Sequence, residues 1–251
     1  MFSFIKRAIR PYVPQSILDA LARYRREKDI RAHDAIFQGK DRKYIFSEIY
    51  AKFWWGHPLN SEQFNSGHGS HFAVHVDPYV DAVSAFLQTF ACPQNVVDLG
   101  CGDFNVGSRL RRHCATYVAC DIAPDLLERN KKKFHDLNVD FRCLDIVADP
   151  LPHGDVVIVR QVLQHLSNED IKSVATKLRG YKFLVLTEFV PDSEFTPNID
   201  QPTGAFSRLA RGIKSGVVLT EEPFSLKAKS ERVICTSQES GALVTTIVYE
   251  L

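Results

Sequence analysis

The sequence has few features of a membrane, secreted or disulfide-bonded protein. No stretch reaches the roughly 18 consecutive apolar residues that cross a bilayer. The first residues lack the apolar core of a secretory signal, because Lys6, Arg7 and Arg10 interrupt it. The six cysteines include no Cys-x-x-Cys pair, so we expect reduced thiols that pack as small hydrophobes. These absences favour a cytoplasmic protein.

Excess charge of one sign and internal repeats are also missing. The formal net charge is +1, which gives no general basis for binding nucleic acid, and we expect no such partner. The 251 residues, 45% of them hydrophobic, suffice for one large domain and an appendage. Nothing in the composition sets the oligomeric state.

The most informative segment is an apolar run that ends in glycines. Val96, Val97 and Leu99 precede Gly100 and Gly102, and a helix-like segment follows over 107–113. Glycines let the backbone pass close to a ligand, while free N–H groups and the helix dipole face it. The pattern predicts the first strand, turn and helix of a nucleotide-binding α/β sheet.

Further strands follow at regular spacing, separated by helical segments. Acids close two of them, Asp121 and Asp145, and Asp121 stands 19 residues after Gly102, where a carboxylate can accept hydrogen bonds from ribose hydroxyls. Alternating strands and helices predict an α/β fold with a doubly wound, mostly parallel sheet that binds ligands at the carboxyl ends of its strands. These predicted strands cover 117–120, 139–144, 155–159 and 181–187.

The motif Asp98-Leu99-Gly100-Cys101-Gly102, with Asp121 and Asp145-Ile146, resembles the class I S-adenosylmethionine (SAM) dependent methyltransferases over roughly residues 90–190. The resemblance implies their Rossmann-like fold of seven strands, here with an N-terminal helical extension, and SAM as cofactor. It implies ribose binding by Asp121, adenine contacts from Asp145-Ile146, and a segment 160–166 that faces methionine and acceptor. The expected cofactor-binding residues are Trp55, Gly67, Ser70, Asp98, Gly100, Gly102, Asp103, Asp121, Ile122, Asp145, Ile146, Arg160 and Gln161.

Phe104 departs from the pattern, because many members carry a third glycine there. A nicotinamide site of the Gly-x-Gly-x-x-Gly type would instead require glycine at Asn105. Three alternatives stay open: an NAD-type nucleotide role, a SAM-binding scaffold without catalysis, and an α/β domain that binds nothing.

The chain divides by composition into an arm (1–40), a cap region over the cofactor site (41–90) and a SAM-binding catalytic domain (91–251). The arm has nine Lys/Arg against four Asp/Glu, and its apolar residues resume at helical spacing from Ile17, with Ser16 as a plausible cap. One interpretation is an ordinary helix packed on the domain. The other is a basic amphipathic anchor, in which residues 1–14 contact a partner or the inner membrane surface peripherally.

The cap region contains Trp54-Trp55 and a Ser-Gly-His-Gly-Ser stretch at 66–70. The tryptophans are expected to shape a pocket wall, and Gly67, Gly69 and Ser70 to offer backbone N–H groups to the methionine carboxylate of SAM. The alternative is a structured loop with its aromatic residues in the core. His68, His71, His75 and Asp77 have a metal-like spacing, but a hard cation needs more carboxylates, so we expect no metal.

Methyl transfer to a hydroxyl requires an in-line donor and a base for the proton. His165 is the candidate general base, and a helical turn over 161–165 would place it on one face with Gln161. Ser167 and Asp170 resemble a capping box for a helix over 168–178, which gives His165 a purely structural alternative. Arg160 is expected to orient an anionic acceptor or to pair with Asp145 or Glu188, and Glu188 is a second acid–base candidate.

The segment 191–216 is long enough to be a substrate loop, and the alternative is a solvated crossing loop. Its Phe206, Arg208, Arg211 and Lys214 would suit an acidic or phosphorylated sugar. Apolar segments at 217–219, 232–235 and 243–249 follow, and the last two fit an antiparallel hairpin with a turn over 238–241.

The layout of this chain is similar to bacterial methyltransferases associated with surface-glycan synthesis. The similarity lies in the basic arm, in Trp54-Trp55-Gly56 with the 66–70 stretch, and in the Gln-x-Leu-x-His-Leu segment 161–166. It implies a sugar hydroxyl as the acceptor, in glycan biosynthesis. The rival is a small-molecule or natural-product oxygen acceptor.

Overall fold

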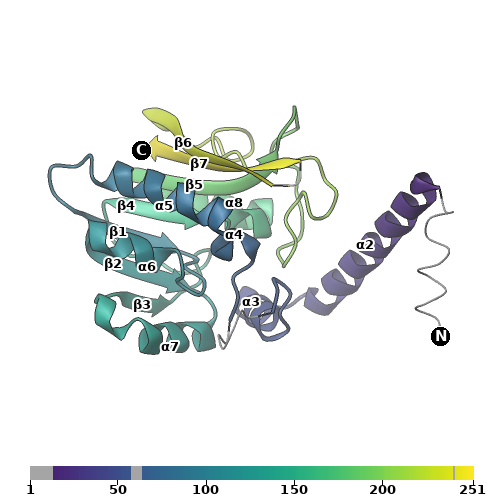
Figure 1. Cartoon of the computed structure of the whole chain (residues 1–251), viewed down its shortest axis with the longest axis horizontal. Helices are drawn as coiled ribbons and strands as arrows, with labels where there is room; N and C mark the ends of the chain where they lie inside the picture. Colours follow the sequence, from purple (N-terminus) through teal and green to yellow (C-terminus); the bar gives the residue numbers. More distant parts are fainter. Residues whose placement is uncertain (1–13, 58–63, 240) are drawn as a thin grey trace. The chain divides into compact units, whose positions relative to one another are not determined.

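The computed structural model describes residues 14–57, 64–239 and 241–251. The chain forms two compact units, 1–39 and 40–251. In the first, helix α2 covers Gln15–Phe37 (Figure 1). Its N-cap is Pro14, with no side-chain cap, so Ser16 lies inside the helix and its predicted capping role is wrong. The predicted contacts of residues 1–13 lie outside the described part of the chain.

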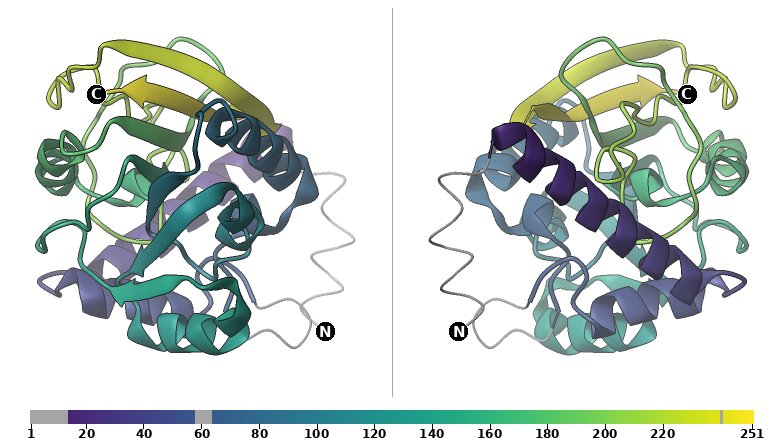
Figure 2. Two further views of the ribbon diagram at one scale, coloured as in Figure 1. Left: turned by 90° about the vertical axis from the view of Figure 1, so that its left-hand side faces the viewer. Right: turned by 90° about the vertical axis from the view of Figure 1, so that its right-hand side faces the viewer.

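The second unit is built on a seven-stranded sheet, as the resemblance implied. Its first five strands are parallel, β7 is antiparallel to β5, and β6 is antiparallel to β7. The prediction of a mostly parallel sheet is therefore only partly right, because two strands at one edge are antiparallel. Figure 2 shows β6 and β7 at one edge and β3 at the other. The order is β3 (Asp140–Cys143), β2 (Cys114–Asp121), β1 (Gln94–Leu99), β4 (Val156–Arg160), β5 (Phe183–Pro191), β7 (Ala242–Glu250) and β6 (Ser230–Glu239).

Helices cover both faces of the sheet because neighbouring strand residues point to opposite sides. Val96 and Ile158 pack in one buried cluster with α5, whereas Val97 and Val157 pack in another with α8. None of the described helices is long and apolar enough to cross a membrane. The helices of this unit are α3 (Arg42–Ala51), α4 (His68–His71), α5 (Ala73–Leu87), α6 (Gly107–Leu110), α7 (Pro124–Lys133) and α8 (Asn168–Leu178), with 3-10 turns η2 (Arg111–His113), η3 (His135–Leu137) and η4 (Leu163–His165).

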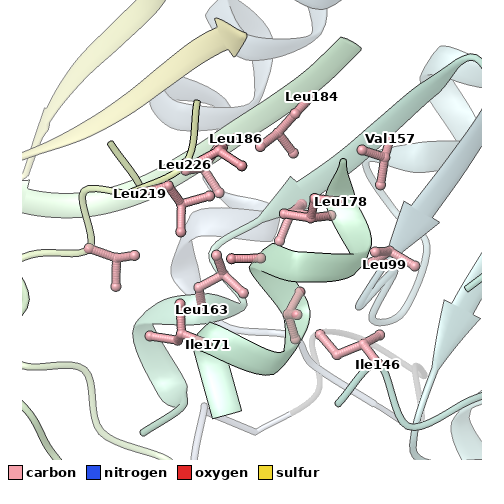
Figure 3. Packing of buried hydrophobic residues seen from close by; sticks show 14 of the residues in the cluster. Leu99, Ile146, Val157, Leu163, Ile171, Leu178, Leu184, Leu186, Leu219 and Leu226 are labelled. Carbon is pink, nitrogen blue, oxygen red and sulfur yellow. The ribbon is translucent and has the colours of Figure 1, made fainter. Parts of the chain in front are cut away.

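The cluster under α8 is closed by the segment 192–229. Figure 3 shows Leu163, Ile171 and Leu178 gathered in one cluster with residues of the strands, together with Leu219 and Leu226. No strand forms at 217–219, so the extended segment suggested by its apolar residues is not part of the sheet. Burying each such side chain contributes about 1.5–3 kcal/mol, which holds this long connection against the core.

The start of α8 has the predicted bounds and the predicted cap. The Ser167 hydroxyl accepts a hydrogen bond from the Asp170 N–H at 3.2 Å. The reciprocal bond of a capping box is replaced, because the Ser167 N–H donates to the Thr203 hydroxyl and that hydroxyl donates to Asp170. The helix start is thereby tied to the segment 192–229.

Phe104, which stands where many related sequences have glycine, is a core residue. Its φ is +60°, in the left-handed region, and its side chain is fully buried. The ring makes edge-to-face contacts with Tyr117, Phe134 and Phe141, with centroids 5.0–5.5 Å away. The phenylalanine that replaces glycine therefore fills the core beneath the turn. The burial of its ring offsets the free-energy cost of its left-handed backbone conformation.

We expect Phe104→Ala to lower the free energy of unfolding by about 3–5 kcal/mol, because it empties a fully buried aromatic site. Phe53 is the matched control, since its φ is also positive (+55°) while its side chain is 38% exposed. Phe53→Ala should change stability by less than about 1 kcal/mol. Urea denaturation of both variants measures this, and equal losses would contradict a packing role for Phe104.

Candidate functional site

A cavity of about 400 Å³ lies at the carboxyl ends of the parallel strands. It is lined by the residues that follow β1, β2, β3 and β4, together with residues of α3, of the loop 64–72 and of the segment 192–229. All of the predicted cofactor-binding residues line it. The sheet topology thus brings the separate strand-end motifs to one site.

The glycine turn after β1 forms one wall of the cavity. Gly100 has a φ of +78° and Gly102 of +57°. A Cβ atom at Gly100 would lie 2.4 Å from Val162 Cγ2, and one at Gly102 would lie 2.4 Å from Ser66 Oγ. Both conformation and close approach therefore require glycine, since a larger residue would push away the segments that enclose the cavity.

Asp121, at the end of β2, presents a buried carboxylate to the cavity. Its two oxygens accept hydrogen bonds from the Gly102 N–H at 3.0 Å and the Ala123 N–H at 3.1 Å. Burial raises the pKa of this carboxyl, and these backbone donors oppose the rise. Each oxygen keeps a further lone pair, so the group is fixed in place and still able to accept bonds from a ligand.

Asp98, in β1, lies deeper in the same wall. Tyr117 donates its hydroxyl to one carboxylate oxygen at 2.9 Å. Burial raises the pKa of Asp98 to about 7, Tyr117 and Arg160 lower it, and Asp121 raises it. A ligand with a positive charge near this group would favour the ionised carboxylate.

The opposite wall is the loop 64–72, which is held by Asp103. One Asp103 carboxylate oxygen accepts the Ser66 N–H at 3.0 Å and lies 2.7 Å from His71 Nε2. In return, the Asp103 N–H donates to the Ser66 hydroxyl at 2.8 Å. Both the side-chain carboxylate and the main-chain N–H of Asp103 thus bond the cap region to the glycine turn.

The expected cradle of backbone N–H groups in this loop is wrong in two of its members. The Gly67 N–H donates to Asn65 Oδ1 and the Ser70 N–H to the Gly67 carbonyl. Despite its glycines, the loop forms the helical turn α4, and these bonds hold it. Gly67, Gly69 and Ser70 therefore line the cavity, but the amides of Gly67 and Ser70 are used within the loop.

The histidines of this region have separate partners. His71 pairs with Asp103, His68 stacks on Phe72, and His75 lies 2.9 Å from the Ser237 hydroxyl. Within residues 14–57, 64–239 and 241–251, no group of three or more potential ligands is arranged to hold a metal ion.

The wall after β3 carries Asp145 and Ile146, with Ile122 from the β2 end beside them. Asp145 accepts hydrogen bonds from Arg42 Nε at 2.9 and 3.2 Å and from the Val147 N–H. Arg42 also donates to Asp170 at 2.9 Å. Arg42 was missed in the sequence, since an arginine at the start of a helix 103 residues away carries no signal for this contact.

Arg160 ends β4 inside the cavity, but its partners are not the predicted ones. It donates to the Gly69 carbonyl at 2.6 Å and to Gln161 Oε1 at 3.3 Å. Its guanidinium group lies 4.6 Å from the ring centre of Tyr79. The expected pairing with Asp145 or Glu188 is wrong, because Asp145 is bound by Arg42 and the loop 64–72 lies against Arg160.

The remaining wall is largely aromatic, and we call Trp55, Gln164, His165, Phe189 and Ala205 the acceptor wall. The Trp55 indole donates to the Ala205 carbonyl at 3.0 Å, and its ring lies 5.0 Å from that of His165. Gln164 Oε1 accepts the Phe189 N–H at 3.1 Å. The tryptophan is therefore a pocket wall, as predicted.

His165 lies in η4, not in the predicted helical turn with Gln161. Gln161 has a φ of +55° and its N–H donates to the Thr187 carbonyl, so it still belongs to the strand end and shares no helix face with His165. Enclosure lowers the pKa of His165 to about 4, while the backbone of Gly204 and Ala205 counteracts this. The imidazole is neutral at pH 7.

Glu188 and Arg208 are internal and do not line the cavity in the described chain. Burial raises the pKa of Glu188 to about 8, and Arg208 lowers it. Arg208 donates to the Ile199 carbonyl at 2.7 Å and to Asn168 Oδ1 at 2.8 Å. Arg208 therefore braces the segment 192–229 from within, which contradicts its predicted role toward an acceptor.

Comparison with known proteins agrees with this geometry. Residues 96–181 match the family described as a methyltransferase domain. Uncharacterized methyltransferases of Mycobacterium bovis and Mycobacterium tuberculosis are 31% identical to this chain over 109 residues, which is 43% of this chain and 52% of each relative. The chain thus spans about half the length of the curated relatives it matches.

Solved structures share the fold over 84% of this chain. The N-methyltransferase NodS from Bradyrhizobium japonicum, in complex with S-adenosyl-L-homocysteine (SAH), is 14% identical, with a TM-score of 0.57 over 84% of this chain and 99% of that one. Magnesium protoporphyrin IX methyltransferase from Synechocystis, with bound SAH, is 16% identical, with a TM-score of 0.55 over 84% of this chain and 100% of that one. Residues 96–181 are therefore similar to a methyltransferase domain, and the chain shares the Rossmann-like fold of these methyltransferase structures.

The buried Glu188 predicts a pH dependence of stability. Its pKa in the folded state, about 8, exceeds its ordinary value of 4.5, so the folded protein binds the proton more tightly and stability falls as pH rises between these values. In Glu188→Gln this fall should shrink by at least about 1 kcal/mol. Urea denaturation at pH 5 and pH 8 measures it, with exposed Glu194→Gln as the control, and an unchanged pH slope would contradict the buried neutral carboxyl.

Proposed function

We propose that this chain is a SAM-dependent methyltransferase that transfers a methyl group to an oxygen acceptor, with a sugar hydroxyl as the substrate group. The observation that carries the proposal is the common cavity, which is lined by Asp121, the glycine turn and the acceptor wall together. The methyltransferase-domain match and the SAH-bound structures of the same fold support SAM as the cofactor.

The residues around the cavity fit the parts of SAM. Asp121 would hold the ribose hydroxyls, and Ile122 and Ile146 would contact the adenine. Asp98, Arg160 and Gln161 would bind the methionine part. The charges of Asp98 and Arg160 are opposite to those of its ammonium and carboxylate groups, respectively. The bound sulfonium supplies the methyl group, and the protein positions the acceptor in line and excludes water.

The acceptor wall favours an uncharged ring over an anionic substrate. Among its described members none is positively charged, because the His165 imidazole is neutral and Arg208 points into the interior. A tryptophan face offers a flat apolar surface for the C–H side of a sugar. A domain of this fold, that of EvdMO1, was crystallised in the presence of SAH and D-fucose, so its fold is compatible with a sugar. A small-molecule oxygen acceptor is the alternative.

The function is tested by transfer of labelled methyl from SAM into a fractionated bacterial extract. We expect label in the polysaccharide or lipid-linked fraction. Asp121→Ala should abolish it and weaken SAH binding by at least about 100-fold, since two hydrogen bonds to a carboxylate are each worth about 1.5–3 kcal/mol. Calorimetry measures the affinity, with exposed Asp125→Ala as the control.

Label in the small soluble pool would favour the metabolite alternative. Absence of label from every fraction, with SAH still bound, would contradict the enzyme and leave a SAM-binding scaffold. Equal SAH affinity in Asp121→Ala would remove the ribose assignment.

We further propose that His165 is the general base that takes the hydroxyl proton. Because its pKa is about 4, the imidazole is unprotonated above that pH, so kcat should be level from about pH 5 to 8 and fall below it. His165→Ala should lower kcat by about 10²–10⁴-fold with SAH affinity unchanged, whereas the exposed His153→Ala should match wild type. Retained activity in His165→Ala would exclude this role.

A further inference from the structure

Glu239, the last residue of β6, lines the cavity and has no part in the cofactor binding or proton transfer proposed above. Its side chain is 29% exposed. In the described ranges 14–57, 64–239 and 241–251, no lysine or arginine pairs with this carboxylate and no hydrogen bond reaches it. A carboxylate that loses water without gaining donors is costly, so a molecule that fills the cavity beside Glu239 must itself supply hydrogen-bond donors.

The neighbour of Glu239 within the fold is His75 of α5. His75 Nε2 lies 3.5 Å from Glu239 Oε2, and His75 Nδ1 lies 2.9 Å from the Ser237 hydroxyl. The imidazole is buried and is not among the residues that line the cavity. This single contact leaves lone pairs on both carboxylate oxygens able to accept hydrogen bonds from a ligand.

The strand register places Glu239 on the same face of the sheet as Phe189 of the acceptor wall. Phe189 pairs with Val244, Val244 pairs with Ser237, and Glu239 lies two residues beyond Ser237. Paired residues point to the same face, as do residues two apart in one strand. Only β7 separates β5 from β6 (Figure 1), so these strands are about 10 Å apart. Because Phe189 and Glu239 both line the cavity, one acceptor molecule can contact both.

We infer that Glu239 is a specificity-determining residue, which accepts hydrogen bonds from two adjacent hydroxyls of a neutral sugar and excludes sugars that carry a carboxylate or phosphate group. This inference rests on the proposed function and names the acceptor class of that site. The two carboxylate oxygens can each accept from one of two neighbouring hydroxyls. An anionic sugar would bring a second negative charge into an enclosed site, where water screens the repulsion poorly.

The test uses the full-length protein, saturating labelled SAM, and glycans of the bacterial extract freed of carrier lipid and separated by anion exchange into a neutral and an acidic pool. We expect the wild type to label the neutral pool at least about 10-fold more per mole of sugar. Glu239→Gln keeps the shape and removes the charge, so this preference should fall at least about fivefold. Its apparent KM for the neutral pool should rise about 10-fold, with kcat and SAH affinity within about twofold of wild type.

Two further variants separate charge from reach and from the strand itself. Glu239→Asp keeps the charge on a shorter side chain, so it should keep the preference for the neutral pool while its apparent KM rises. Glu231→Gln is the matched control, since Glu231 is an exposed residue of the same strand that does not line the cavity. It should match the wild type in KM, pool preference and SAH affinity.

An ammonium group could also donate to Glu239, and chemical treatment of the neutral pool distinguishes it from hydroxyls. Acetic anhydride in water acetylates amines and leaves sugar hydroxyls free, so we expect labelling of the treated pool to equal that of the untreated pool. Loss of labelling after this treatment would overturn the assignment of hydroxyls as the partner of Glu239.

Unchanged KM and pool preference in Glu239→Gln would overturn the inference and leave the proposed function intact. Equal losses of SAH affinity and acceptor binding in this variant would also overturn it, because Glu239 would then support the fold or the cofactor. A wild-type protein that binds SAH and labels neither pool would overturn the sugar acceptor of the proposed function, and the role of Glu239 with it.

Discussion

The cavity depends on the interactions of one side chain, that of Asp103. Its carboxylate binds the Ser66 N–H and His71, while its own N–H binds the Ser66 hydroxyl. These bonds join a loop that precedes β1 to the turn that follows it. The loop 64–72 supplies the wall opposite the glycine turn, and Arg160 holds the same loop at the Gly69 carbonyl. The low dielectric of this enclosed site strengthens such bonds and makes a missing partner costly.

The cavity has a charged half and a neutral half. Asp98, Asp121 and Asp145 come from three strand ends, and Arg42 and Arg160 partly balance them. The acceptor wall carries an indole, an amide and a neutral imidazole instead. Such a division suits a reaction in which a charged donor is bound tightly and its methyl group is then transferred to an uncharged acceptor shielded from water.

Several polar residues that look functional in the sequence have internal structural roles. Glu188 and Arg208 are buried and are not among the residues that line the cavity, and Arg208 binds the Ile199 carbonyl and Asn168. Arg42 shows the reverse, because it lies at the cavity and joins Asp145, after the end of β3, to Asp170 in α8, although no local motif marks it in the sequence. A charge in a loop can bind a ligand or brace the fold, and only its burial and its partners distinguish these roles.

The sequence by itself determined the order and type of most elements, including the helix 168–178, and the strand-end acids Asp121 and Asp145. It could do so because side-chain periodicity, glycine turns and helix caps are local, and the strand ends of a parallel sheet share one edge. Only the tertiary structure decided that Arg42 binds Asp145, that the Phe104 side chain is buried in the core, and that the Gln164 amide lies beside the imidazole of His165. Those contacts depend on side-chain orientation and on residues far apart in the chain, and local sequence patterns carry no information about either.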